Sequence, residues 1–310
     1  MRLTFSFDPI DTPSVLALGM FDGVHTGHAW LLRTAREWGT LENLPVVVCT
    51  FLKHPMALLK PEAAPIMLST VAERAARMAQ LQVDRVAVLR FDLELMNMPP
   101  ESFVQLLVNR YNPRHVVIGF NYSFGQGGKG DAKLLKEMGK RLGFEVHVVS
   151  PVQVDDQTVS STRVRQLLEQ GDVEQAARLL ERPYSVAGRV VHGKELGRKL
   201  GFPTANVSIP KGKALPDFGI YVARVKIRQG VYPAVVSLGY HPTVPEGDIT
   251  LEAHLLNWSG DLYGQRMRVK FLKRIRPEVK FDSVDALKEQ IASDVRTARS
   301  YFRIRRENRT

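Results

Sequence analysis

Residues 14–38 read SVLALGMFDGVHTGHAWLLRTAREW, and this stretch decides the fold. The apolar run 14–19 is typical of a buried strand, and the apolar residues of 30–38 recur on one helical face. Between them lies a glycine-punctuated turn with two histidines, His25 and His28. In an open α/β sheet, ligands bind where strands hand over to helices, because a helix N-terminus offers free N–H groups and a positive dipole end. The stretch predicts such a sheet with a ligand site at HTGH.

The same alternation of strand and helix continues to about residue 180. Strand-like runs at 45–51, 85–91, 115–120 and 145–150 are separated by helix-like runs at 70–81, 101–111 and 131–142. Thr70 and Glu73 have the spacing of a capping box, and Gly143 is placed to end a helix. This order predicts a doubly wound, mostly parallel sheet with helices on both faces, a Rossmann-like α/β domain.

The pattern changes after Arg182-Pro183. Five β-rich segments at 184–193, 221–227, 231–239, 250–258 and 266–275 follow one another without helices, and 228–230 has the form of a hairpin turn. They predict a closed or nearly closed antiparallel β-barrel. A C-terminal helix follows, with Leu287, Ile291, Val295, Ala298 and Phe302 on the face that packs on the barrel.

Composition narrows the class of protein. The 310 residues are 44% hydrophobic and 24% charged, which favours roughly two globular domains and argues against disorder. No apolar run has membrane-spanning length, so no membrane association is expected. The net charge of +11 permits nucleic acid but fits nucleotides and phosphorylated metabolites equally well. A single cysteine, Cys49, and the lack of a secretory signal predict a cytoplasmic protein.

Two further segments carry groups suited to phosphate. Glycines 125, 127, 128 and 130 surround Lys129 and let backbone N–H groups approach an anion. Ser160, Ser161 and Thr162 supply hydroxyls at a helix start, and Arg163 and Arg165 add positive charge. Each segment also has a plainer interpretation, as a surface loop or an N-cap, and the histidines themselves could be capping or solvated groups. A metal site at His25 and His28 lacks further ligands at suitable spacing.

Taken together, the motifs resemble a known family. GMFDGVHTGH, HVVIGFNYSFGQGGKGD and VSSTRVRQLLEQGDVEQAARLLERPY are similar to the nucleotidyltransferase half of prokaryotic bifunctional riboflavin kinase/FAD synthetases. GRVVHGKELGRKLGFPTANV, SLGYHPTV and LEAHLLNW continue the likeness through the second half. HxGH alone is shared by many nucleotidyltransferases, whereas its combination with SSTxxR and GFPTAN is specific.

The resemblance implies two domains, an FMN adenylyltransferase at 1–182 and a riboflavin kinase at 183–310, both using ATP with Mg²⁺. In the first, it implies catalytic roles for His25, His28, Asn121 and Arg165, because adenylyl transfer needs donors around growing phosphate charge. The remaining nucleotide- and phosphate-binding positions that it implies are Gly19, Phe21, Asp22, Gly23, Gly27, Ser160, Ser161, Thr162 and Arg163.

In the second domain the resemblance makes Thr204 and Asn206 oxygen ligands of Mg²⁺, and Glu252 the base that accepts the riboflavin hydroxyl proton. It adds Gly193, Lys199, Gly201 and Pro203 as nucleotide-binding positions. Without it, GFPTAN is simply a barrel turn and Glu252 a solvent-facing strand residue.

The predicted reactions are riboflavin plus ATP giving FMN, then FMN plus ATP giving FAD and pyrophosphate. The expected partners are therefore small molecules, with no nucleic acid, and the chain is expected to be a monomer or weak homo-oligomer. Ala29, Trp30 and Val244 depart from the family pattern, which bears on substrate affinity. Two alternatives stay open: an adenylyltransferase for another phosphorylated precursor, with the barrel only for recognition, and a flavin-sensing or RNA-binding regulator on a decayed enzyme scaffold.

Overall fold

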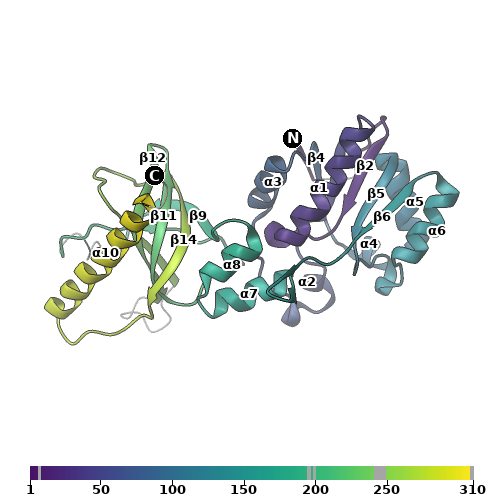
Figure 1. Cartoon of the computed structure of the whole chain (residues 1–310). Helices are drawn as coiled ribbons and strands as arrows, with labels where there is room; N and C mark the ends of the chain where they lie inside the picture. The colour runs from purple at the N-terminus through teal and green to yellow at the C-terminus, as the bar shows by residue number, and fades with distance from the viewer. Residues whose placement is uncertain (6–7, 194–196, 198–199, 241–248, 308–310) are drawn as a thin grey trace. The chain divides into compact units, whose positions relative to one another are not determined.

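The computed structural model describes residues 1–5, 8–193, 197, 200–240 and 249–307 (Figure 1). The chain divides into two compact units, Met1–Ser161 and Thr162–Thr310. The sequence-predicted positions Lys199 and Val244 lie outside the described residues.

The first unit is built on a six-stranded sheet in the order β1-β4-β3-β2-β5-β6, with every neighbouring pair parallel. Its strands are β1 (Arg2–Thr4), β2 (Ser14–Leu18), β3 (Val46–Phe51), β4 (Arg85–Leu89), β5 (Pro113–Gly119) and β6 (Glu145–Val149). The main helices are α1 (Thr26–Leu41), α3 (Val71–Gln80), α5 (Pro100–Tyr111) and α6 (Ala132–Leu142). Shorter elements are η1 (Asp22–Val24), α2 (Met56–Leu59), η2 (Pro61–Ala63), α4 (Leu93–Asn97), η3 (Gln126–Gly128), β7 (Gln153–Val154) and β8 (Gln157–Thr158).

The continuous apolar strands are explained by burial on both faces. In β2, Leu16 and Leu18 join a core with α5 and α6, whereas Val15 and Ala17 join a second core with α1 and α3. Successive side chains of a strand point to opposite faces, so a strand covered on both sides needs apolar residues at every position. Figure 1 shows one layer of helices on each face of the sheet. The doubly wound α/β prediction is confirmed.

The second unit is a closed antiparallel barrel in the order β10-β13-β12-β11-β14-β9. Its strands are β9 (Ser185–Val191), β10 (Ala205–Val207), β11 (Gly219–Ile227), β12 (Gly230–Tyr240), β13 (Ile249–Leu255) and β14 (Arg266–Arg276). Helices α7 (Ser161–Glu169) and α8 (Val173–Leu180) precede it, α8 packs against β14, and α10 (Val284–Glu307) follows. Sequence analysis identified five of these strands, and GFPTAN holds the start of the sixth, β10.

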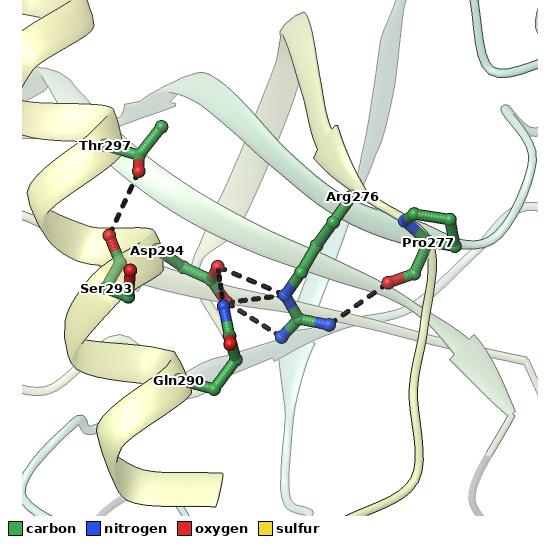
Figure 2. A network of polar contacts seen from close by, with 6 residues as sticks. All are labelled: Arg276, Pro277, Gln290, Ser293, Asp294 and Thr297. Carbon is green, nitrogen blue, oxygen red and sulfur yellow. Dashed lines mark hydrogen bonds and ion pairs between the residues drawn. The ribbon is translucent and has the colours of Figure 1, made fainter.

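Helix α10 lies along the barrel through an apolar and a polar contact. Val295 and Ala298 are buried in a core with Ile220 and Val222 of β11, as the helical spacing predicts. Beside this core, Arg276 donates to both carboxylate oxygens of Asp294, at 2.8 to 3.2 Å (Figure 2). Gln290 Nε2 also donates to Asp294, at 3.0 Å. Asp294 is almost fully buried, so the ion pair and amide satisfy a charge that water does not reach.

Candidate active sites

The strand order of the first unit marks the position of a ligand site. The chain runs outward in one direction from β2 through β3 to β4, then returns to the other side of β2 with β5. In open α/β sheets, the crevice at the carboxyl ends of the two strands flanking this reversal binds the ligand. HTGH follows β2 and the segment 119–131 follows β5. The fold therefore brings two of the predicted phosphate-handling segments to one edge.

A strained turn places the histidines after β2. Phe21, Gly23 and Val24 all have positive φ, at 51°, 75° and 42°, a conformation that costs free energy for residues other than glycine. Asp22 holds this turn, because its buried carboxylate accepts from the backbone N–H groups of Leu68 and Ser69 at 2.9 and 3.0 Å and from the Ser69 hydroxyl. Asp22 was predicted to bind phosphate, but both of its carboxylate oxygens accept hydrogen bonds from Leu68 and Ser69.

The Ser69 hydroxyl also accepts from the Gly23 N–H, at 2.9 Å. At the start of the turn, a Cβ on Gly19 would lie 3.2 Å from the Phe21 ring. Position 19 therefore has little room for a side chain while Phe21 stays buried, and both residues serve the turn.

His25 and His28 lie face to face at the start of α1. Their ring centroids are 3.7 Å apart, and the planes are inclined by 17°. His25 is the N-cap of α1, and its Nδ1 accepts from the His28 backbone N–H at 3.3 Å. Since Nδ1 accepts, the neutral His25 ring carries its proton on Nε2, which makes Nε2 a donor. A Cβ on Gly27 would approach the His25 ring to 3.3 Å, so glycine keeps room for the stack.

His28 is held in its neutral form. Burial, the adjacent His25 and the positive charge of Arg74 all lower its pKa well below the ordinary histidine value. Its Nδ1 is buried and has no hydrogen-bond partner among the described residues. A buried nitrogen without a partner costs free energy, and a phosphate oxygen or an ordered water would supply the missing bond.

Arg74 is a site residue that sequence analysis missed. Its guanidinium is buried and donates to the carbonyl oxygens of Met20 and Phe51, at 3.0 and 2.9 Å, and to the Thr50 hydroxyl, at 3.2 Å. These groups follow or end β2 and β3, so Arg74 fixes the two strand ends and adds a positive charge near HTGH. The sequence feature that could have identified it is an arginine on the otherwise apolar face of α3, beside Ala75 and Met78.

The segment after β5 forms a glycine-rich loop closed by the Phe124–Gly130 bridge. Gly125, Gly127 and Gly128 have φ of 71°, 64° and 68°, values that favour glycine. A Cβ on Gly125 would lie 2.6 Å from Pro100, so this position also has no space for a side chain. Asn121 is exposed just beyond the end of β5. The structure thus places Asn121 at the carboxyl edge of the sheet.

The serine-rich segment divides between the two units. Ser161 Oγ donates to the Asp22 carbonyl at 2.9 Å, which joins the start of α7 to the HTGH turn. Ser160 lies immediately before it in the same unit, whereas Thr162, Arg163 and Arg165 lie in α7 within the second unit.

In the barrel, the predicted kinase residues meet across strands β10 and β13. Thr204 Oγ1 donates to Glu252 Oε2 at 2.9 Å, although 48 residues separate them in the chain. Asn206 is the register partner of Glu252. Ala205 and Val207 are buried while Asn206 is half-buried, so Thr204 and Asn206 share the other face of the chain. The structure gathers three oxygen-bearing side chains into one cluster.

Two glycines shape the backbone around this cluster. A Cβ on Gly193 would lie 2.2 Å from Asn206 Nδ2, so position 193 must lack a side chain for the amide to stay where it is. Gly201 has a φ of 87°, which a glycine adopts without strain. Next to it, the Pro203 carbonyl contacts His254 Nδ1 at 2.9 Å. Since a carbonyl only accepts, His254 carries a proton on Nδ1 and fixes the turn, a role that sequence analysis did not assign.

Comparison with known proteins finds a matching family for each half of the chain. The family model for FAD synthetase matches residues 8–163, and that for riboflavin kinase matches residues 180–302. A bifunctional riboflavin kinase/FMN adenylyltransferase of Escherichia coli K12 is 39% identical over 290 residues, covering 93% of this chain and 92% of the relative. One from Pseudomonas fluorescens is 40% identical over 288 residues and covers 92% of each.

A solved structure agrees over nearly the whole chain. It comes from Streptococcus pneumoniae, carries the name macrolide-efflux protein, is 32% identical, and covers 96% of this chain and 99% of its own, with a TM-score of 0.89. None of the helices that the structure describes combines the length and the apolar character of a membrane span.

The match to a riboflavin kinase domain rules out the alternative in which the barrel serves only for recognition. With an FAD synthetase domain and a riboflavin kinase domain joined in one chain, the protein belongs to the family of bifunctional riboflavin kinase/FMN adenylyltransferases.

Proposed function

We propose that the two reactions of this ATP-dependent flavin enzyme use the two residue clusters described above, one in each unit. Riboflavin is phosphorylated at Thr204, Asn206 and Glu252, and FMN is adenylylated at HTGH and the neighbouring loops. The observation that carries the assignment is the Thr204–Glu252 hydrogen bond, which joins two family motifs at 2.9 Å.

In the kinase reaction, the riboflavin hydroxyl oxygen forms a bond to the γ-phosphorus of ATP, the bond from that phosphorus to ADP breaks, and the hydroxyl proton moves to Glu252. A carboxylate within hydrogen-bond reach can take this proton as the new bond forms. Because Thr204 donates to Oε2, we assign Oε1 as the acceptor. Thr204 therefore orients the base as well as lying beside the phosphates.

The oxygen donors of this cluster fit a magnesium ion. A hydroxyl and an amide oxygen are the hard ligands that Mg²⁺ prefers, and Mg²⁺ takes most of its other ligands from phosphates and water. Gly193 sets the place of the Asn206 amide through the close approach described above. We assign Thr204 and Asn206 as its protein ligands. When bound, Mg²⁺ neutralises charge on the ATP phosphates.

In the adenylyl transfer, an FMN phosphate oxygen forms a bond to the α-phosphorus of ATP, and the bond to pyrophosphate breaks. No side chain has to take a proton, so the protein contributes position and charge stabilisation. A neutral imidazole is suited to this, because its N–H donates without the ring being protonated. His25 Nε2 and His28 are the proposed donors, with Asn121 positioning the two polyanions. The positioning role of Arg165, which lies in the other unit, stays a prediction from the family resemblance.

The predicted setting follows from the chemistry. ATP, riboflavin, FMN and FAD are its small-molecule partners, and we expect no nucleic-acid partner. A single buried thiol, Cys49, matches a reducing compartment, so we place the enzyme in the cytoplasm as a monomer or weak homo-oligomer.

A time course tests the proposal. The protein is incubated with riboflavin, ATP and Mg²⁺, and the flavins are separated at intervals. FMN that forms first and then declines as FAD accumulates supports both assignments. FMN alone would leave the first unit without its reaction, and no conversion would favour the flavin-sensing regulator.

A further inference from the structure

We propose that His115, Glu145 and His147 bind a divalent transition-metal ion, of the Zn²⁺ class, at the end of the sheet opposite to HTGH. His115 is the third residue of β5, and Glu145 and His147 are the first and third residues of β6. His115 and Glu145 are register partners, and His147 lies two residues farther on the same face of its strand. Neither proposed reaction uses these residues.

The three ligand atoms form a triangle of suitable size. His115 Nδ1 lies 3.0 Å from His147 Nε2, and Glu145 Oε2 lies 3.9 Å from each of these nitrogens. The point equidistant from all three is about 2.1 Å from each atom, which is the length of Zn–N and Zn–O bonds. The spacing therefore suits an ion that replaces the hydrogen bond between the two rings.

A buried nitrogen supplies a second, independent indication. His115 is 2% exposed, and its Nε2 has no hydrogen-bond partner among the described residues. The Glu42 carboxylate is 3.0 Å from this Nε2 but poorly aligned. Ligation through Nδ1 would place the proton on Nε2, and the Glu42 carboxylate would have to turn toward it to complete the carboxylate–histidine–metal arrangement that orients ligands in metal sites. Arg114 holds Glu42 from its other side, at 2.6 Å.

A tryptophan orders both imidazole rings. Trp38 stacks on both His115 and His147, with ring centroids 4.5 and 4.4 Å away.

The ligand set selects the class of ion. Two imidazoles and one carboxylate suit Zn²⁺, Co²⁺, Ni²⁺ or Cu²⁺, whereas Mg²⁺ and Ca²⁺ prefer all-oxygen sites. Three protein ligands leave a fourth position, which water fills in comparable zinc sites.

Metal titration of the full, chelator-treated chain tests the site, without ATP or flavin present. Zn²⁺ binding is measured by calorimetry, and Co²⁺ binding by its visible absorption and by quenching of Trp38. We expect one tight equivalent, a higher melting temperature with Zn²⁺, and affinity about 10- to 100-fold weaker in Glu42→Gln, with a larger loss in His147→Gln. The matched control, His192→Gln, removes an exposed histidine stacked on Tyr263 in the barrel and should bind as the wild type does.

Folding of the variants is checked by circular dichroism and by retained FAD synthesis, since His147 lies outside the proposed machinery. Zn²⁺ that binds folded His147→Gln as tightly as the wild type would overturn the proposal. So would a wild-type chain whose melting temperature and Co²⁺ spectrum do not respond to metal.

Discussion

The proposed role of His28 in adenylyl transfer can be tested by removing its side chain. Loss of one preorganised donor to a charge-building oxygen costs on the order of 10²-fold in rate. We therefore expect His28→Ala to lower FAD formation from supplied FMN by about this factor, and His25→Ala to act in the same direction. Riboflavin phosphorylation by the same preparations should be unchanged, because it uses residues of the barrel.

The control for this prediction is the melting temperature. Histidines that only cap or pack would, when replaced, lower stability and both activities together. A well-folded His25→Ala/His28→Ala double variant with wild-type FAD synthesis would contradict the proposed role.

The lowered pKa of His28 also predicts a pH dependence of stability. Below the ordinary histidine pKa of about 6.5, the unfolded chain binds a proton at this residue that the folded chain does not. Stability is therefore full above that pH and falls as the solution becomes more acidic, by at most about 1.4 kcal/mol per pH unit for one proton. The free energy of unfolding, measured with urea at pH 5 to 7, should therefore change less steeply with pH in His28→Asn than in the wild type. His147 contributes in the same direction in both proteins and cancels in the comparison.

Glu252 can be tested against its hydrogen-bond partner. Glu252→Gln keeps the shape but removes the base, so FMN formation should fall by roughly 10²- to 10⁴-fold while FAD formation from FMN persists. Thr204→Val removes the hydroxyl that orients the base, and Thr204→Ser is the matched variant that retains it. Near wild-type kinase activity in Glu252→Gln would remove Glu252 from the mechanism.

At the scale of elements, the attachment of α10 depends on a buried charge pair. Removing one partner of a buried pair costs about 3–5 kcal/mol when the other charge has no alternative partner. Arg276 keeps some solvent exposure and also bonds the Pro277 carbonyl (Figure 2), so Asp294→Ala should fall at or below the lower end of that range. Denaturant unfolding of the barrel measures the loss. Glu289→Gln, on the exposed side of α10, is the control, and an equal effect of the two changes would refute the prediction.

Helices and strands could be predicted where a long apolar pattern in the sequence determines them. The long strands β2 to β6 and the helices α1, α3, α5 and α6 follow from apolar periodicity, and the Thr70–Glu73 capping box is present as expected. The short strands β1 and β10 were missed, because three residues carry too little pattern and their pairing partners lie far along the chain.

The candidate sites divide in the same way. The HTGH motif and GFPTAN were found from local sequence and family likeness. The contacts of Arg74, Glu42 and His254 were not, since each depends on segments that only the tertiary fold brings together.

For the whole molecule, the two compact units predict separable activities. A fragment from Pro183 to Thr310 contains the whole barrel and should phosphorylate riboflavin. A fragment from Thr162 adds α7 and α8. Val173, Leu179 and Leu180 of α8 are buried, and the Leu168 carbonyl of α7 accepts from the Asp217 N–H at 2.8 Å. We expect the longer fragment to melt at a higher temperature, with both making FMN. A folded fragment that makes none would disprove separability.

The short strand β10 affects how readily the proposed kinase site opens by local unfolding. It closes the barrel with two register pairs to β13 and two to β9, whereas β11 and β12 are joined by nine. A seam held by so few backbone bonds opens at a lower free energy than the rest of the barrel, and this seam carries Asn206 and adjoins Thr204. Amide protons of 205–207 should therefore exchange with deuterium faster than those of β11. If ATP and riboflavin bind the closed seam, as proposed, they should slow that exchange selectively, so amide exchange would report that the site is occupied without following the reaction.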